Sequence, residues 1–191
     1  MSGKRTEKMG GRTGFAGLLD DLRYHEISRQ GIGLLLLPVS AWFSHPGSSR
    51  VWIGLALAAL GQTWRIYAAG VIYKNKELAT TGAYSLVRHP LYLGNFLILA
   101  GFTLACANWA VLALVIFFLL FYYPAAIRYE DAKLEGIFGD SWRTWGLDTP
   151  AMFPVRLKWK ANPDAEWNAR QSLLRNGELP ISAYLATCAV L

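Results

Sequence analysis

The chain has 191 residues, of which 53% are hydrophobic, with eight tryptophans and a formal net charge of +6. An ordinary soluble domain contains only about 45–50% apolar residues, so this composition excludes a typical soluble domain and favours a membrane protein. The positive charge calls for no nucleic-acid partner, because basic segments beside a membrane are attracted to the anionic lipids of the inner leaflet.

The first two apolar segments predict membrane-spanning helices. Ile32–Phe43 reaches spanning length only together with the flanking residues Ile27–Gln30. Val51–Tyr73 is long enough alone, since about 20 residues cross the hydrocarbon core, and only Gln62 and Arg65 interrupt it. An ionisable residue at such a depth is a functional candidate, although snorkelling or pairing with another helix explains Arg65 equally well.

The next two apolar segments predict an antiparallel helical hairpin. Leu91–Ala105 and Trp109–Ile127 are separated only by Cys106, Ala107 and Asn108, which leaves room for a tight turn. The last apolar segment, Ile181–Leu191, predicts either an incomplete fifth span or a docking segment. Cys106 and Cys188 lie far apart without metal-ligand spacing, so we expect no metal site.

The distribution of basic residues predicts the topology. Six Lys and Arg residues precede the first span, whereas the following loop contains only Arg50, so the N-terminus should be cytoplasmic. We therefore expect one domain over residues 1–191, an all-α, polytopic integral-membrane bundle of about four transmembrane helices. It would have a basic N-terminal segment (1–30) and a C-terminal extension (155–191). In a bacterial inner membrane, both termini and the candidate site would be cytoplasmic.

The most informative motif is Arg-His-Pro-x-Tyr-x-Gly, from Arg88 to Gly94. Proline is favoured at the first position of a helix, so we expect a helix to begin at Pro90 with His89 as its N-cap. The helix N-terminus and Arg88 together suit a carboxylate or phosphate, and Gly94 allows a close backbone approach. The alternative is that Arg88 and His89 only cap a transmembrane helix at the lipid headgroups.

A second motif follows the hairpin. Helical spacing places Glu130 on one face with Ile127, Leu134 and Phe138, where a carboxylate is costly unless it is paired. Asp131, on the other side, is expected to be solvated. Pro124 can kink this helix and turn Glu130 toward the Arg-His-Pro corner, so that both motifs enclose one pocket. The alternative is a pair with Lys133 at the headgroup boundary.

The order of these motifs resembles a known family. Thr81-Gly82-x-Tyr84, the Arg-His-Pro motif, the apolar hairpin, the Glu130-Asp131 pair and Phe138-Gly139 resemble the isoprenylcysteine carboxyl methyltransferases and related phospholipid methyltransferases, over roughly Gly54–Pro154. The resemblance implies S-adenosylmethionine as cofactor and a lipid-like or prenylated acceptor taken from the bilayer. The implied cofactor positions are Lys76, Glu77, Leu78, Ala79, Tyr84, His89, Pro90, Leu91, Tyr92 and Glu130.

The catalytic prediction rests on two arginines, Arg88 and Arg128. The isoprenylcysteine enzymes that this chain resembles share a substrate-binding arginine at the position of Ala126. Arg128 could take the role of that arginine. The acceptor therefore stays open between a carboxyl, an amine and a thiol, and the oligomeric state is equally open. Two other functions remain: an NADPH-dependent enzyme similar to sterol reductases, which are usually longer, and a non-catalytic lipid-binding or scaffold protein.

Overall fold

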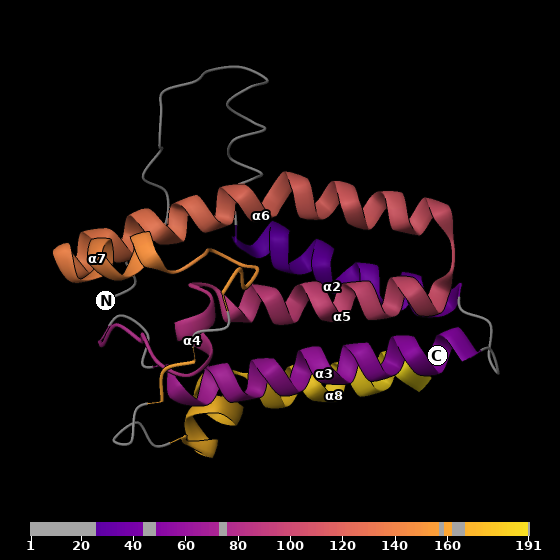
Figure 1. The fold of residues 1–191 in the computed structure, drawn as a ribbon. Coiled ribbons are helices and arrows are strands. Elements are labelled where there is room, and N and C mark those ends of the chain that lie inside the picture. Colours follow the sequence, from indigo (N-terminus) through magenta and orange to yellow (C-terminus); the bar gives the residue numbers. More distant parts are fainter. Residues whose placement is uncertain (1–25, 44–48, 73–75, 157–158, 162–166, 191) are drawn as a thin grey trace.

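The computed structural model describes residues 26–43, 49–72, 76–156, 159–161 and 167–190, with only the backbone described for 26–30. Every regular element in this part of the chain is a helix, as expected (Figure 1). The elements are α2 (Glu26–Trp42), α3 (Ser49–Val71), α4 (Ala83–Leu86), α5 (Pro90–Cys106), α6 (Trp109–Phe138), α7 (Asp140–Asp148), the π-helical turn η1 (Gln171–Arg175) and α8 (Glu178–Val190).

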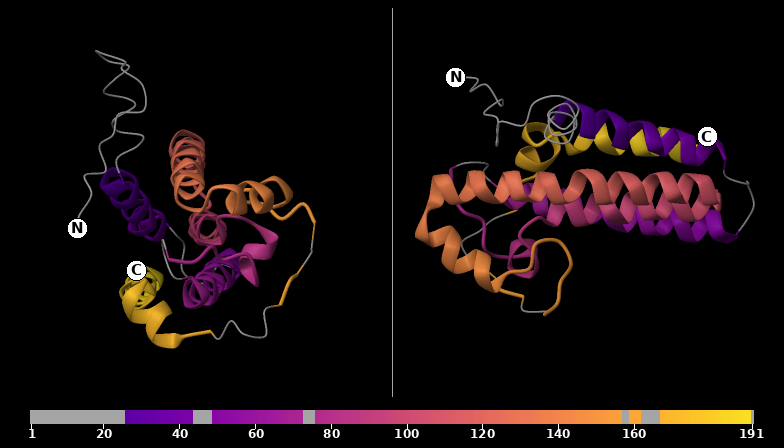
Figure 2. Two further views of the ribbon diagram at one scale, coloured as in Figure 1. Left: turned by 90° about the vertical axis from the view of Figure 1, so that its left-hand side faces the viewer. Right: turned by 90° about the horizontal axis from the view of Figure 1, so that it is seen from above.

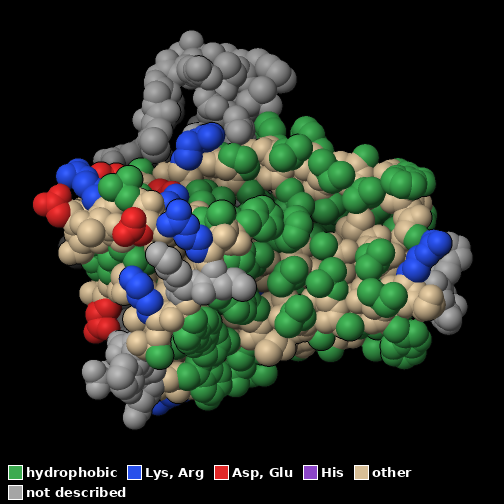
Figure 3. All heavy atoms as spheres, viewed as in Figure 1, with side chains coloured by type: hydrophobic (Ala, Val, Ile, Leu, Met, Phe, Trp, Pro, Cys, Tyr) green, Lys and Arg blue, Asp and Glu red, His purple; other side chains and the backbone are tan. Residues whose placement is uncertain are grey.

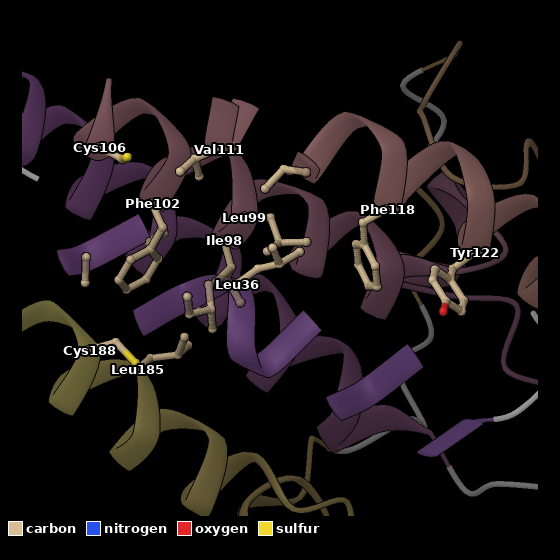
Figure 4. Packing of buried hydrophobic residues seen from close by; sticks show 14 of the residues in the cluster. Leu36, Ile98, Leu99, Phe102, Cys106, Val111, Phe118, Tyr122, Leu185 and Cys188 are labelled. Atoms are coloured by element: carbon tan, nitrogen blue, oxygen red, sulfur yellow. The ribbon is translucent and has the colours of Figure 1, made fainter. Parts of the chain in front are cut away.

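The centre of the bundle is the antiparallel pair of α3 and α5, which pack against each other more extensively than any other two elements. Figure 2 shows α2, α6 and α8 arranged around this pair. Their inward side chains form one apolar core, in which Leu36, Phe102, Phe118 and Leu185 come from four different helices (Figure 4). Two sets of basic residues in the topology prediction lie outside the described residues: those that precede Arg29, and Lys74.

Glycines allow α3 and α5 to approach this closely. A Cβ atom on Gly101 would lie 2.4 Å from the carbonyl oxygen of Gly54, and one on Gly61 would lie 2.7 Å from that of Gly94. Real Cβ atoms do not come so close to a backbone oxygen, so the contact requires glycine at these positions. The prediction of a close approach at Gly94 is confirmed, and the approaching segment is α3.

The ends of α5 and α6 confirm the predicted hairpin. Helix α5 begins with Pro90 at its first position and His89 as N-cap, and it ends at Cys106. Ala107 then adopts the left-handed conformation (φ 50°), and the Asn108 side chain caps α6 by accepting from the amides of Ala110 and Val111. Helix α6 continues through Pro124 to Phe138, well beyond the predicted end of the span.

The C-terminal segment returns to the cytoplasmic end predicted for α3. Trp167 Nε1 and Ser172 Oγ both donate to the Ile66 carbonyl, at 3.2 and 2.7 Å, and Asn176 Nδ2 donates to the Ala69 carbonyl at 2.7 Å. The bond to Ala69 supplies a partner at the end of α3, where carbonyl groups otherwise lack one, and the two bonds to Ile66 extend the contact one turn back along the helix. Helix α8 then runs back along α2 and α3, so the apolar C-terminal stretch is a fifth packed helix.

The surface of the bundle is largely apolar. Figure 3 shows hydrophobic side chains over the length of the helices and most charged side chains near α7. Exposed side chains include those of Trp52, Trp109, Phe117 and Leu120. An apolar surface of this extent marks a membrane or interaction face. Of the described helices, only α6 is both long and apolar enough to be a clear span; the apolar stretches Gly31–Trp42, Pro90–Cys106 and Glu178–Val190 are shorter.

Candidate functional site

A cavity of about 550 Å³ lies inside the helical bundle and reaches the Arg-His-Pro corner. This volume falls within the roughly 300–1,000 Å³ typical of small-molecule sites. Nine of the ten implied cofactor positions line it, namely Glu77, Leu78, Ala79, Tyr84, His89, Pro90, Leu91, Tyr92 and Glu130. Lys76 is not among the lining residues. Of the two predicted catalytic arginines, Arg88 lines the cavity, whereas Arg128 is exposed on α6 and does not.

The cavity wall changes character along the bundle. Its end near α7 carries the polar residues of the two motifs together with Glu77 and Lys133. Its other end is lined by apolar side chains from α2, α5, α6 and α8, including Leu37, Ile98, Leu99, Phe118 and Leu185. The cavity thus has a polar end and an apolar end.

At the polar end, the two motifs meet through His89. Its Nε2 atom lies 2.8 Å from Asp131 Oδ1, and its Nδ1 atom lies 3.5 Å from Glu130 Oε2. The two ring nitrogens flank Cε1 and their N–H directions diverge, which lets adjacent carboxylates on α6 reach the same ring. The prediction that the two motifs enclose one pocket is confirmed.

The expectation that Asp131 is solvated is wrong. Its side chain is 15% exposed, against 45% for Glu130, and its Oδ2 atom also binds Arg88 Nη2 at 2.9 Å. The helical pattern missed this because Arg88 and His89, which precede α5, contact the side of α6 that carries Asp131. The chain after α7 folds back onto these two residues. There the Arg88 and His89 amides donate to the carbonyls of Pro150 and Ala151, at 2.8 and 2.9 Å.

Arg88 holds this returning segment in place. Its Nη1 atom donates to the carbonyls of Gly146 and Thr149, at 2.7 and 2.9 Å, while its Nη2 atom binds Asp131. The Trp142 ring also lies against the guanidinium, with its centroid 5.7 Å from Cζ. These contacts give Arg88 a structural role at the rim of the cavity.

The electrostatics of the corner favour a charged His89. Burial lowers the pKa of His89, but hydrogen bonds to Asp131 and Glu130 outweigh burial and raise the pKa above its usual value. A protonated ring donates from both nitrogens, which matches the two carboxylates it faces. The ring also stacks on that of Tyr92, with centroids 5.4 Å apart.

Tyr84 supplies a buried polar group to the cavity. Its side chain is 4% exposed, and its hydroxyl has no hydrogen-bond partner within the described part of the chain. Burial, and the negative charge of Glu130, raise its pKa, so the hydroxyl stays protonated. A buried hydroxyl without a partner is uncommon, and this one can hydrogen-bond to a group that enters the cavity.

A second polar cluster, deeper in the bundle, was only half predicted. Arg65 pairs with Glu178 of α8 through Nη2–Oε1 at 2.6 Å and Nε–Oε2 at 3.1 Å, and its Nη1 atom donates to Asn95 Oδ1. Gln62 Nε2 also donates to Glu178 Oε2, at 3.0 Å. Pairing with another helix therefore accounts for Arg65. Glu178 was missed, although it is the lone acid of α8 and lies beside an apolar run, as the cation Arg65 lies within the apolar run of α3.

The described residues contain no group of three or more His, Cys, Asp or Glu side chains placed to hold a metal ion. A family model described as phospholipid methyltransferase matches residues 49–141. No solved structure matches the chain.

Three curated proteins are similar in sequence. The cobalt-zinc-cadmium resistance protein CzcN of Cupriavidus metallidurans is 33% identical over 153 residues, which cover 74% of this chain and 69% of that protein. The nickel-cobalt-cadmium resistance protein NccN of Alcaligenes xylosoxydans xylosoxydans is 36% identical over 114 residues, covering 59% and 52%. The protein-S-isoprenylcysteine O-methyltransferase of Schizosaccharomyces pombe is 30% identical over 100 residues, covering 52% and 42%. The chain thus matches about half or less of the last two proteins.

Proposed function

The chain belongs to the isoprenylcysteine carboxyl methyltransferase family, with its phospholipid methyltransferase relatives, and on this premise we propose that it is a multi-pass membrane methyltransferase. It would use S-adenosylmethionine to methylate a lipid-like or prenylated acceptor. One observation carries the proposal: nine implied cofactor positions line one end of a cavity whose other end is apolar. The polar end suits a charged cofactor, and the apolar end suits a lipid chain.

The residues of the polar end fit this cofactor. Tyr84 offers an unpartnered hydroxyl, and Glu130 keeps a half-exposed carboxylate that can accept from an ammonium or hydroxyl group. Tyr84 and Tyr92 also bring aromatic rings to the cavity, and such rings attract a cationic group such as a sulfonium. When bound there, S-adenosylmethionine would supply an electrophilic methyl group.

The contribution of the protein would be alignment and exclusion of water rather than strong acid–base chemistry. His89, held between two carboxylates, fixes the orientation of Glu130 at the polar end. Arg88 keeps the segment after α7 closed over the corner. The apolar walls from Ile98, Leu99 and Phe118 would enclose the acceptor chain. Because Arg128 lies outside the cavity, we propose that the acceptor binds without it.

Binding measurements test the proposed cofactor. The chain in lipid nanodiscs should bind S-adenosylmethionine and S-adenosylhomocysteine saturably in calorimetry, and should bind NADPH far more weakly. Tighter binding of NADPH would instead assign the chain to enzymes similar to sterol reductases. Mass spectrometry of lipid extracts from cells with and without the protein would then identify acceptors that gain one methyl group.

We also propose that the end of the bundle with α7 and the site faces the cytoplasm, with about four spans in a bacterial inner membrane. The charged residues near α7 and the uncharged turn at Ala107 support this orientation. A cysteine introduced at Asn108 should react with an impermeant reagent from outside, and one at Gly139 only after permeabilisation. The reverse labelling pattern would rule out a cytosolic route for the cofactor.

A further inference from the structure

Three polar side chains from three helices meet in the wall of the cavity: Arg65 of α3, Asn95 of α5 and Glu178 of α8. Two hydrogen bonds join the guanidinium to the carboxylate, and a third joins it to Asn95. Glu178 is 1% exposed, so this pair lies in the interior. Because the two charges balance, the cluster presents hydrogen-bonding groups to the cavity without a net charge.

The contact with Arg65 fixes the orientation of the Asn95 amide. A guanidinium only donates hydrogen bonds, so the atom facing it must be the Asn95 oxygen. The NH₂ group of Asn95 consequently points elsewhere. No described residue accepts a hydrogen bond from this NH₂ group, and its nitrogen atom is not fully buried, so the group stays accessible. Because Asn95 lines the cavity, its NH₂ group is available there as a hydrogen-bond donor.

Asn95 lies between the two ends of the cavity. It lies five residues after Pro90, which is about 7.5 Å along the axis of α5 at 1.5 Å per residue. Ile98 and Leu99, which line the apolar end, follow one turn later in the same helix. An amphiphile with its chain among the apolar residues and its head group toward His89 would pass Asn95 at the level of the head group.

We propose that the NH₂ group of Asn95 binds an oxygen atom in the head group of the methyl acceptor, and that the Arg65–Glu178 pair positions this amide. The inference rests on the proposed methyltransferase function and narrows its acceptor. A donor suits a head group with a carbonyl or carboxylate oxygen, whereas it would compete for the lone pair of an amine. Asn95 would also give this chain a polar contact to the methyl acceptor. The resemblance places the substrate-binding arginine of the isoprenylcysteine enzymes at position 126, where this chain has a buried alanine.

The test uses the whole chain in phosphatidylcholine nanodiscs saturated with S-adenosylhomocysteine, titrated calorimetrically with three probes of equal chain length. Decanoate carries a charged carboxylate, methyl decanoate an uncharged carbonyl, and decylamine a cation without an acceptor oxygen. Comparing variants with the same probe cancels its partition into lipid. The variants are Asn95→Leu, which removes the donor, and Asn95→Asp, which keeps an oxygen toward Arg65 but replaces the donor by a second oxygen. Thr103→Val on the same helix is the control, because the Thr103 hydroxyl bonds only within α5.

We expect Asn95→Leu to weaken binding of methyl decanoate about two- to tenfold, the value of one neutral hydrogen bond. Binding of decanoate should weaken more, about ten- to a hundredfold, because its hydrogen bond is charge-assisted, and decylamine should be unchanged. Asn95→Asp should shift the preference to decylamine, and Thr103→Val should match the wild type. Oxygen probes that keep their affinity in both Asn95 variants would overturn the proposal. A wild-type chain that shows the probe pattern but fails to bind S-adenosylhomocysteine would contradict the methyltransferase function instead.

Discussion

The two ionic clusters of the cavity differ in burial and in how far apart their partners lie in the sequence. The rim cluster of His89, Arg88, Asp131 and Glu130 is partly exposed and joins two recognisable motifs. The deep cluster of Arg65 and Glu178 is buried and joins residues 113 positions apart. The rim cluster can therefore be recognised from sequence motifs, whereas the deep pair forms only through the packing of α8 against α3.

Breaking the deep pair should have the largest effect. Replacing Glu178 by Gln leaves the Arg65 cation buried without its counter-charge, which typically costs about 3–5 kcal/mol. We expect a matching loss of stability in detergent, measured by denaturant unfolding. Glu135→Gln, which breaks an exposed pair with Arg143, is the control and should change stability little.

A double variant sharpens this prediction. Arg65→Met with Glu178→Leu removes both charges together, so it should be more stable than Glu178→Gln alone. If the double variant were the less stable of the two, the pair would contribute through its hydrogen bonds to Gln62 and Asn95 rather than through charge balance.

At the rim, we expect the adjacent carboxylates to have different roles, with Asp131 supporting stability and Glu130 binding the cofactor. Asp131→Asn removes the anion that binds both Arg88 and His89, so we expect a loss of about 1–3 kcal/mol in stability. The loss would show as a lower midpoint of thermal unfolding, about 2–4 °C for each kcal/mol in a chain of this size. A stability equal to wild type would mean that Arg88 and His89 keep their positions without the Asp131 anion.

Glu130→Gln should instead act on the cofactor. The half-exposed carboxylate can also make a charge-assisted bond to the cofactor, and losing such a bond should weaken S-adenosylhomocysteine binding about ten- to a hundredfold in calorimetry. Thermal unfolding of the same variant, compared with Asp131→Asn, is the folding control. Equal affinities for wild type and Glu130→Gln would remove this residue from the proposed cofactor site.

The smallest effect is a pH dependence at the rim. The pKa of His89 is raised in the folded protein, so the folded state binds the proton more tightly than the unfolded state. The resulting stability is fully present below pH about 6.5, the usual value, and is lost as the pH rises through the raised pKa. His89→Gln should flatten this part of the curve of unfolding midpoint against pH. A curve of unchanged slope would place the titration on another group.

Local signals predicted much of the fold and the rim. Proline at the first helical position, the three-residue turn before Trp109 and the order of the motifs each depend on neighbours in sequence, and the structure has them where expected. The role of Asp131 was missed because helical periodicity treats α6 as having one inner face, while Arg88 and His89 contact a second. Glu178 was missed because its partner depends on how α8 packs, which no local pattern encodes.

The glycine contacts between α3 and α5 also bear on how the cavity could open. Where Gly54 meets Gly101 and Gly61 meets Gly94, backbone lies directly on backbone, and no side chain stands between them that could change rotamer to permit sliding. The two helices therefore behave as one rigid unit that carries Arg65 and Asn95 together. Admission of an acceptor and release of its methylated product would then depend on movements of α2, α6 and α8, which meet this unit through side chains.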